Sequence, residues 1–200
     1  MKRIILILLI LNLYIANAKD TTILFLGDSL TEGFGVDKEK AYPKLVEELI
    51  QTKLNKNIKV INGGVSGSTT SDALARLRWY LRKKPDLIFI ALGANDGLRG
   101  LNLSQSEKNL EEIIKYALKS KTKVLLAGMI IPPNYGPKYA NEFKEMYEKL
   151  RVKYTLKTMP FLLDGIAGKK ELNQRDGIHP NEKGHKHIAN NVFEFIKEDL

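Results

Sequence analysis

The sequence contains no cysteine, which excludes a structural disulfide and an amino-terminal lipid anchor attached through that residue. It also lacks internal repeats, low-complexity tracts and any stretch with the composition of a linker. No block of like charge stands out, although the formal net charge is +9. The lysines alternate with glutamates, as they do on solvated helix faces, so we expect no nucleic-acid partner.

The amino terminus has the form of a secretory signal peptide. Two basic residues precede an apolar run over 4–15, and Ala16-Asn17-Ala18 supplies the small residues that a signal peptidase recognises. A retained membrane anchor is the alternative, but the run is about a dozen residues long, short of the roughly 20 that span a bilayer. We therefore predict a signal over 1–18 cut after Ala18, a single domain over 19–200, and a periplasmic or secreted protein.

Segments typical of strands and helices alternate along the rest of the chain. Five apolar runs are continuous rather than alternating, as in strands buried on both faces: 23–26, 58–61, 87–92, 124–129 and 161–163. Apolar residues at helical spacing occupy 42–50, 74–81, 110–118, 139–150 and 188–196. Ser104 and Glu107 have the spacing of a capping box before the third of these helices. The alternation predicts an α/β fold, a three-layer α/β/α sandwich around a parallel sheet.

Ser29 lies directly after the first predicted strand, where Gly27 permits a tight turn. A serine hydroxyl becomes a good nucleophile only when a neighbouring base takes its proton. Taken alone, Gly27-Asp28-Ser29 is equally typical of a turn or a helix cap. The strands of one parallel sheet end at the same edge, however, so Ser29 can share a cleft with residues that follow the other strands.

Asp176 and His179 supply a base and a group to orient it. A histidine base needs its second ring nitrogen held, usually by a carboxylate, and a separation of three residues on a turn allows that contact. An aspartate that caps the following helix explains the pair as well. His185 and His187 lie further along that helix, and we interpret both as solvent-facing.

Gly67 and Asn95 complete the set by following two other predicted strands. Attack on an acyl carbonyl places negative charge on its oxygen, and donors aimed at that oxygen are usually the largest catalytic contribution. The Ser29 amide, the Gly67 amide and the Asn95 side chain are three such donors. Each residue has a plainer explanation as part of a turn or loop, but these explanations leave the ordered set of four motifs unaccounted for.

With these motifs the chain resembles the SGNH hydrolase superfamily, also called GDSL esterases and lipases. The shared blocks are Gly27-Asp28-Ser29-Leu30-Thr31-Glu32-Gly33, Asn62-Gly63-Gly64-Val65-Ser66-Gly67, Gly93-Ala94-Asn95-Asp96 and Asp176-Gly177-Ile178-His179-Pro180. The resemblance covers nearly all of 19–200 and is nearest to the bacterial periplasmic thioesterases and lysophospholipases, through 95–100 and 133–136. It implies a flavodoxin-like sheet of five parallel strands, with no metal and no other cofactor.

The resemblance also implies roles for individual residues. Ser29 would be the nucleophile, His179 the base and Asp176 the group that orients it, with oxyanion donors at Ser29, Gly67 and Asn95. A mobile loop and a second wall would bind the acyl chain through Gly97, Leu98, Arg99, Leu101, Ile130, Ile131 and Pro132. Ile130 departs from the pattern of the nearest relatives, in which we expect a basic residue.

We therefore predict a serine esterase or thioesterase that hydrolyses fatty acyl, lysophospholipid or aryl esters, or thioesters, through an acyl-enzyme. The expected partner is a small acyl ester or lipid, with no more than transient contact with a membrane surface, and the expected state is a monomer. One alternative is a metal-dependent phosphoesterase in which Asp28, Asp96, Asp176 and His179 hold a divalent ion. Another is a non-catalytic α/β binding module.

Overall fold

One parallel sheet forms the centre of the molecule, in a computed structural model that describes residues 21–200. Its five strands are β1 (Thr21–Gly27), β2 (Ile58–Gly64), β3 (Leu87–Ala91), β4 (Lys123–Ala127) and β5 (Lys157–Met159). They lie in the order β2-β1-β3-β4-β5, and every neighbouring pair is parallel. The signal peptide predicted over 1–18 lies outside the described residues.

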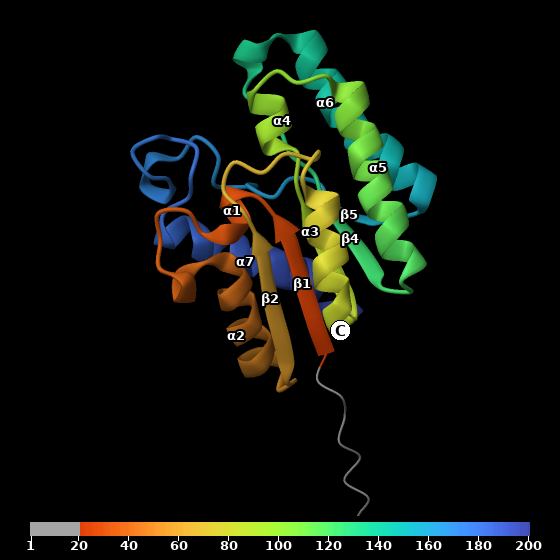
Figure 1. Cartoon of the computed structure of the whole chain (residues 1–200). Helices are drawn as coiled ribbons and strands as arrows, with labels where there is room; N and C mark the ends of the chain where they lie inside the picture. The colour runs from red at the N-terminus through yellow and green to blue at the C-terminus, as the bar shows by residue number, and fades with distance from the viewer. Residues whose placement is uncertain (1–20) are drawn as a thin grey trace, which may run out of the picture.

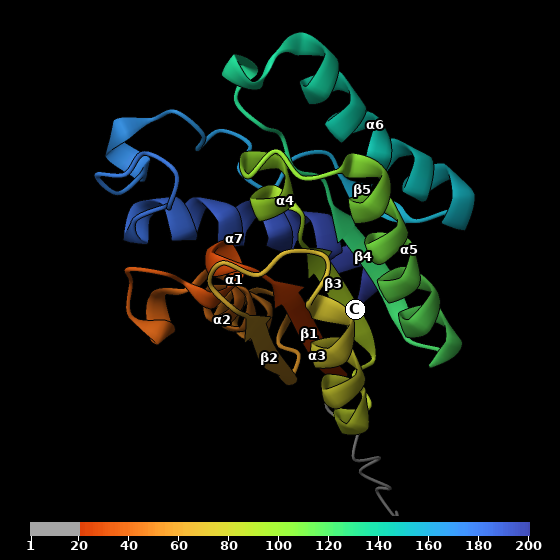
Figure 2. The ribbon, with the colours of Figure 1, turned by 45° about the horizontal axis from the view of Figure 1, so that its top comes forward.

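Helices cover both faces of this sheet (Figures 1 and 2). The α-helices are α1 (Ser29–Glu32), α2 (Tyr42–Leu54), α3 (Ala73–Tyr80), α4 (Ala94–Leu98), α5 (Leu103–Lys119), α6 (Pro137–Tyr154) and α7 (Glu182–Ile196). Short 3-10 helices are η1 (Lys38–Lys40), η2 (Leu81–Lys83), η3 (Pro133–Tyr135), η4 (Lys170–Leu172) and η5 (Lys197–Asp199). Because α2 packs on α7 while α5 packs on both α3 and α6, the helices form two separate layers, and the three-layer prediction is confirmed.

The core lies where the apolar runs predicted it. Every residue of β3 is buried, as are the last five of β1, because both strands have a neighbour on each side and a helix layer on each face. Phe25 of β1 packs edge-on against Tyr42 and at a tilt against Phe89, with ring centroids 5.5 and 5.4 Å apart. β1 therefore leaves the core directly into the segment that carries Ser29.

The strand order places two of the motifs at a topological switch point. The chain passes from β1 outward to β2 and then returns across β1 to β3, so the loops after β1 and β3 diverge at the same edge of the sheet. In open α/β sheets this divergence forms the usual ligand crevice. Ser29 follows β1 and Asn95 follows β3, so both residues lie at the crevice.

Three local predictions are wrong. The fifth strand is Lys157–Met159 rather than 161–163, because Pro160 has no N–H for the sheet ladder and the chain turns away after it. Helix α5 begins two residues before the predicted capping box would allow, with the Asn102 side chain accepting a hydrogen bond from Gln105 N at 3.1 Å. His185 is buried rather than solvent-facing, whereas His187 is exposed as predicted.

The burial of His185 follows from the periodicity of α7. The buried residues Ile188, Ala189, Val192 and Ile196 define one face, and position 185 continues that face by one turn towards the amino end. The ring stacks on Tyr42, and its Nδ1 accepts a hydrogen bond from Tyr42 N at 3.3 Å. Burial, with a smaller contribution from the nearby His179, lowers the pKa of His185 to about 4, so the ring is held in its neutral form.

Candidate active site

Ser29, His179 and Asp176 form one chain of hydrogen bonds across 150 residues of sequence. Nε2 of His179 lies 3.0 Å from Oγ of Ser29, and Nδ1 lies 2.8 Å from Oδ2 of Asp176. A carboxylate at Nδ1 favours the tautomer that carries its proton there, which leaves Nε2 free to accept the serine proton. The structure therefore brings together the three residues that the sequence motifs single out.

Asp176 is held by its own turn as well as by the imidazole. Its Oδ1 accepts hydrogen bonds from the backbone amides of Ile178 and His179, each at 3.0 Å. Partial burial by itself raises the pKa of this carboxyl, but the hydrogen bonds from the His179 amide and ring and from Ile178 outweigh it and lower the pKa to about 2. The carboxylate is therefore ionised and fixed in position beside the ring at neutral pH.

Ser29 begins α1, so its backbone N–H is among those without an acceptor inside the helix. The preceding Asp28 caps this short helix, with Oδ1 accepting from Leu30 N at 3.0 Å. A side chain at Gly27 would overlap the hydroxyl of Thr31, which is why the turn before the serine requires glycine. Burial raises the pKa of Asp28 to about 6, although the nearby charges of His179 and Arg76 act in the opposite direction.

Asn95 and Gly67 are connected through the loop that follows β2. Nδ2 of Asn95 donates to the carbonyl of Ser68 at 3.0 Å. An amide NH₂ carries two hydrogens, so one remains for a ligand. Gly67 has φ +76°, which favours glycine, and its carbonyl accepts a hydrogen bond from Nη2 of Arg99 at 3.0 Å. Both candidate donors are thus fixed to the same short segment.

Asp96 is a buried anchor beneath this segment and is 1% exposed. Its carboxylate accepts from Thr70 N at 3.0 Å, from Thr70 Oγ1 at 2.6 Å and from Ser106 Oγ at 2.8 Å. These bonds join the loop after β2, helix α4 and helix α5. The carboxylate is therefore engaged by protein donors, and in residues 21–200 we find no group of three or more His, Asp or Glu side chains arranged to hold a metal.

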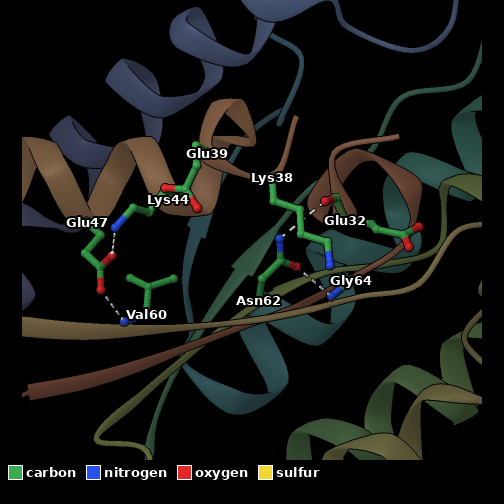
Figure 3. A pocket seen from close by; sticks show the side chains of 8 residues that line it. All are labelled: Glu32, Lys38, Glu39, Lys44, Glu47, Val60, Asn62 and Gly64. Carbon is green, nitrogen blue, oxygen red and sulfur yellow. Dashed lines mark hydrogen bonds and ion pairs between the residues drawn. The ribbon is translucent and has the colours of Figure 1, made fainter. Parts of the chain in front are cut away.

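Asn62 and Glu32 support the end of β2 and the loop that follows it, and both line a hollow of about 330 Å³ (Figure 3). Figure 3 shows the Asn62 side chain on β2, directed towards Glu32 and Gly64. Its Nδ2 donates to Thr31 O at 2.9 Å, and its Oδ1 accepts from Gly64 N at 3.0 Å. Oε2 of Glu32 accepts from Ser66 N at 2.7 Å and from the Ser66 hydroxyl. These hydrogen bonds therefore connect α1, which carries Ser29, to the loop after β2, which carries Gly67.

Arg76 is a site residue that the sequence motifs do not reveal. From α3, its Nη2 donates to Gly27 O and to Ser68 Oγ, both at 2.9 Å. It thereby ties the strand end before Ser29 to the residue whose carbonyl holds Asn95. Nothing in the local sequence separates this arginine from the solvent-exposed Arg78 two residues later; only the packing of α3 against β1 does so.

An apolar groove of about 470 Å³ opens beside Ser29, Asn95 and His179. Four of the residues predicted to bind an acyl chain line it, and they are Leu98, Ile130, Ile131 and Pro132. Another part of its wall is one that the motifs did not predict: Phe161, Leu163, Ala167 and Gly168, from the segment after β5. Pockets that are mostly apolar with a few converging polar groups are typical ligand sites.

The other three predicted acyl-binding residues lie next to the groove rather than in its lining. Gly97 is buried, and a side chain there would meet Ile131 and Phe143. Arg99 extends to the Gly67 carbonyl, and Leu101 is 40% exposed on the loop between α4 and α5. Gly97 thus allows the groove wall to pack closely on α4, while Arg99 supports the glycine loop.

Known proteins are similar to this chain in sequence. A sequence profile of the GDSL-like lipase/acylhydrolase family matches residues 25–187. The chain belongs to this family. It is similar to an arylesterase of Vibrio mimicus, with 36% identity over 201 residues that cover 100% of this chain and 98% of the relative. It is also similar to thioesterase 1/protease 1/lysophospholipase L1 of Escherichia coli K12, with 35% identity over 90% of this chain and 85% of the relative.

The likeness extends to three dimensions. A crystal structure of the psychrotrophic esterase EstA from Pseudoalteromonas sp., inhibited by monoethylphosphonate, has a TM-score of 0.86 and 35% identity. The match covers 90% of this chain and 99% of that structure. The family, the fold and the class of enzyme predicted from the four motifs are confirmed: this is a GDSL-family esterase of the hydrolase class.

Proposed function

We propose that this GDSL-family hydrolase transfers acyl groups from esters or thioesters to water through an acyl-enzyme on Ser29. His179 takes the serine proton as Oγ attacks the carbonyl carbon, and then gives that proton to the leaving alcohol or thiol. Water repeats the sequence, with His179 as base, and the free acid is released. The observation that carries this proposal is the chain from Ser29 Oγ to His179 to Asp176, at 3.0 and 2.8 Å, at the foot of an apolar groove.

We assign the oxyanion to three donors: the Ser29 amide, the Gly67 amide and the free hydrogen on Asn95 Nδ2. Their support comes from hydrogen bonds that hold the groups still before substrate arrives. Donors that need no reorganisation stabilise the developing charge most effectively. Asp96, Arg99 and the Asn95 bond to Ser68 supply that rigidity.

We propose a fatty acyl or aryl ester as substrate, including lysophospholipids and thioesters. The groove is supported as the acyl site by its apolar lining and by its position next to the serine. The names of the relatives, arylesterase and thioesterase 1/protease 1/lysophospholipase L1, agree with that range. Ile130, which is 53% exposed at the groove, extends the apolar surface towards solvent and favours long aliphatic chains.

We further propose an exported monomer that acts in the periplasm or outside the cell and touches membranes only transiently. The support is the basic and apolar pattern of residues 1–18. Within residues 21–200, no helix combines the length and the apolar character that crossing a membrane requires. Size-exclusion chromatography of the mature protein, together with assay of cell fractions, tests both parts.

The function is tested by Ser29→Ala, with hydrolysis of a p-nitrophenyl ester as the readout. Ser104→Ala is the matched control, because Ser104 is exposed on α5 away from the groove. We expect turnover to be lost in the first variant and kept in the second, with activity of the wild type unaffected by EDTA. Wild-type turnover by purified Ser29→Ala would overturn the mechanism. Loss of activity with EDTA would instead favour the metal-dependent phosphoesterase.

A further inference from the structure

Phe34 is a half-exposed aromatic residue that packs directly on the imidazole of His179. The residue is 48% exposed, and the two ring centroids lie 4.6 Å apart at an angle of 41°. It does not line the apolar groove. The molecule therefore presents a second apolar surface at the reacting histidine, separate from the one assigned to the acyl chain.

The backbone holds Phe34 in this position from both sides. Its N–H donates to Ser29 O at 3.1 Å, and its carbonyl accepts from Nε2 of Gln174 at 2.7 Å. Gln174 in turn donates its own N–H to the carbonyl of His179 at 2.8 Å. Figures 1 and 2 show the segment after α1 beside the segment that leads into α7. Phe34 is thus fixed to the serine and to the histidine at once.

The direction of the leaving group follows from the geometry of the tetrahedral intermediate. The carbon bonded to Ser29 Oγ carries three other substituents: the oxyanion, the acyl chain and the leaving oxygen or sulfur. The oxyanion points towards Asn95 and Gly67, and the acyl chain occupies the groove. The leaving atom must approach Nε2 of His179 to receive its proton. The organic group behind that atom then extends past the imidazole, where the exposed ring of Phe34 lies.

We infer that Phe34 forms a leaving-group subsite that selects esters of aromatic alcohols by ring contact. This inference rests on the proposed acyl transfer at Ser29. A planar ring packs on another ring with additional stabilisation of about 0.5–1.5 kcal/mol, which corresponds to about 2- to 13-fold in a rate or binding constant. An alkyl leaving group gains only the burial of its apolar surface. Phe34 therefore raises kcat/KM for aryl esters more than for alkyl esters.

The test compares two esters of one acyl group: the phenyl ester and a hexafluoroisopropyl ester, whose alcohol has comparable acidity. Both give the same acyl-enzyme, so deacylation is identical and kcat/KM reports the step in which the leaving group departs. Phe34→Leu keeps an apolar side chain without an aromatic face, and Phe34→Tyr keeps the face. Trp79→Leu is the control, because Trp79 is an exposed aromatic residue on α3 that packs on Tyr80.

We expect Phe34→Leu to lower the ratio of kcat/KM for the phenyl ester to that for the fluoroalkyl ester about 2- to 13-fold. Phe34→Tyr should keep the wild-type ratio, as should Trp79→Leu. An unchanged ratio would overturn the inference. If both esters lost activity equally, the ring would only position His179; if neither did, the ring would have no role in the reaction. Phe34→Met gives the same comparison if the leucine variant does not fold. If the ratio does not change but turnover still depends on Ser29, only the Phe34 subsite is contradicted. Turnover by the Ser29→Ala variant would instead contradict the proposed acyl transfer.

Discussion

Asp96 should contribute strongly to stability, and Asp96→Ala tests this. The side chain is 1% exposed and accepts three hydrogen bonds, two of them from Thr70 and one from Ser106. Its removal leaves the amide of Thr70 without this partner in a buried position. It also breaks the connection between the loop after β2 and helix α5.

The magnitude follows from the individual bonds. A hydrogen bond to a charged group contributes about 1.5–3 kcal/mol, but removing a carboxylate also removes the cost of burying it. The Ser106 hydroxyl keeps a second acceptor, since it also donates to Asn102 O at 3.3 Å. We therefore expect Asp96→Ala to lower the free energy of unfolding by about 3–5 kcal/mol. Ser106→Ala, which removes one of the three bonds to Asp96 together with the longer bond to Asn102 O, should cost about 1–1.5 kcal/mol.

Urea denaturation followed by circular dichroism measures both variants. The midpoint should fall while the m-value stays the same, since the surface exposed on unfolding is unchanged. A loss below about 1 kcal/mol for Asp96→Ala would show that the three bonds are not a structural anchor. A larger loss for Ser106→Ala than for Asp96→Ala would place the stabilisation on the hydroxyl instead.

Three further predictions concern Asn95, Arg76 and His185. Asn95→Ala should lower kcat about 10²–10³-fold, and a wild-type kcat would reduce Asn95 to a turn residue. Arg76→Met should lower kcat about tenfold with little change in KM, because its hydrogen bonds to Gly27 O and Ser68 Oγ are lost. Arg78→Met, on the exposed side of α3, should change neither constant. Equal effects of the two variants would contradict the role of Arg76. His185→Gln should abolish a pH dependence of stability: burial lowers the pKa of His185 from 6.5 to about 4, so the unfolded chain binds its proton first as the pH falls. The stability advantage of wild type over that variant should shrink by about 3 kcal/mol between pH 6.5 and 4 in urea titrations, and a constant difference would refute the assignment.

The strands of the centre could be read from the sequence because they are buried on both faces. β1 and β3 are short, continuous apolar runs, and this pattern is typical of parallel strands with a helix layer on each face. The edge strand β5 has polar residues and one neighbour only, so the more apolar segment after Pro160 was a misleading signal. That segment instead lines the apolar groove that we propose as the acyl site.

The juxtaposition of Ser29, Asp176 and His179 could be predicted because each lies in a short motif next to a strand or helix. The supporting residues could not. Arg76 and Asp96 act through partners distant in the sequence, and their contacts exist only once α3, α4 and α5 have packed. The burial of His185, by contrast, could have been predicted from the sequence. Histidine is often exposed, but the spacing of the apolar residues of α7 places position 185 on the buried face.

The central claim is that the hydroxyl of Ser29 is an activated nucleophile, and covalent labelling tests it most directly. A fluorophosphonate probe reacts with serines that a neighbouring base activates. Peptide mass spectrometry of the mature protein should find one adduct per chain, on Ser29, formed at a rate that His179→Ala reduces strongly. Catalytically active protein that takes no label, or takes it on another residue, would contradict the assignment of Ser29.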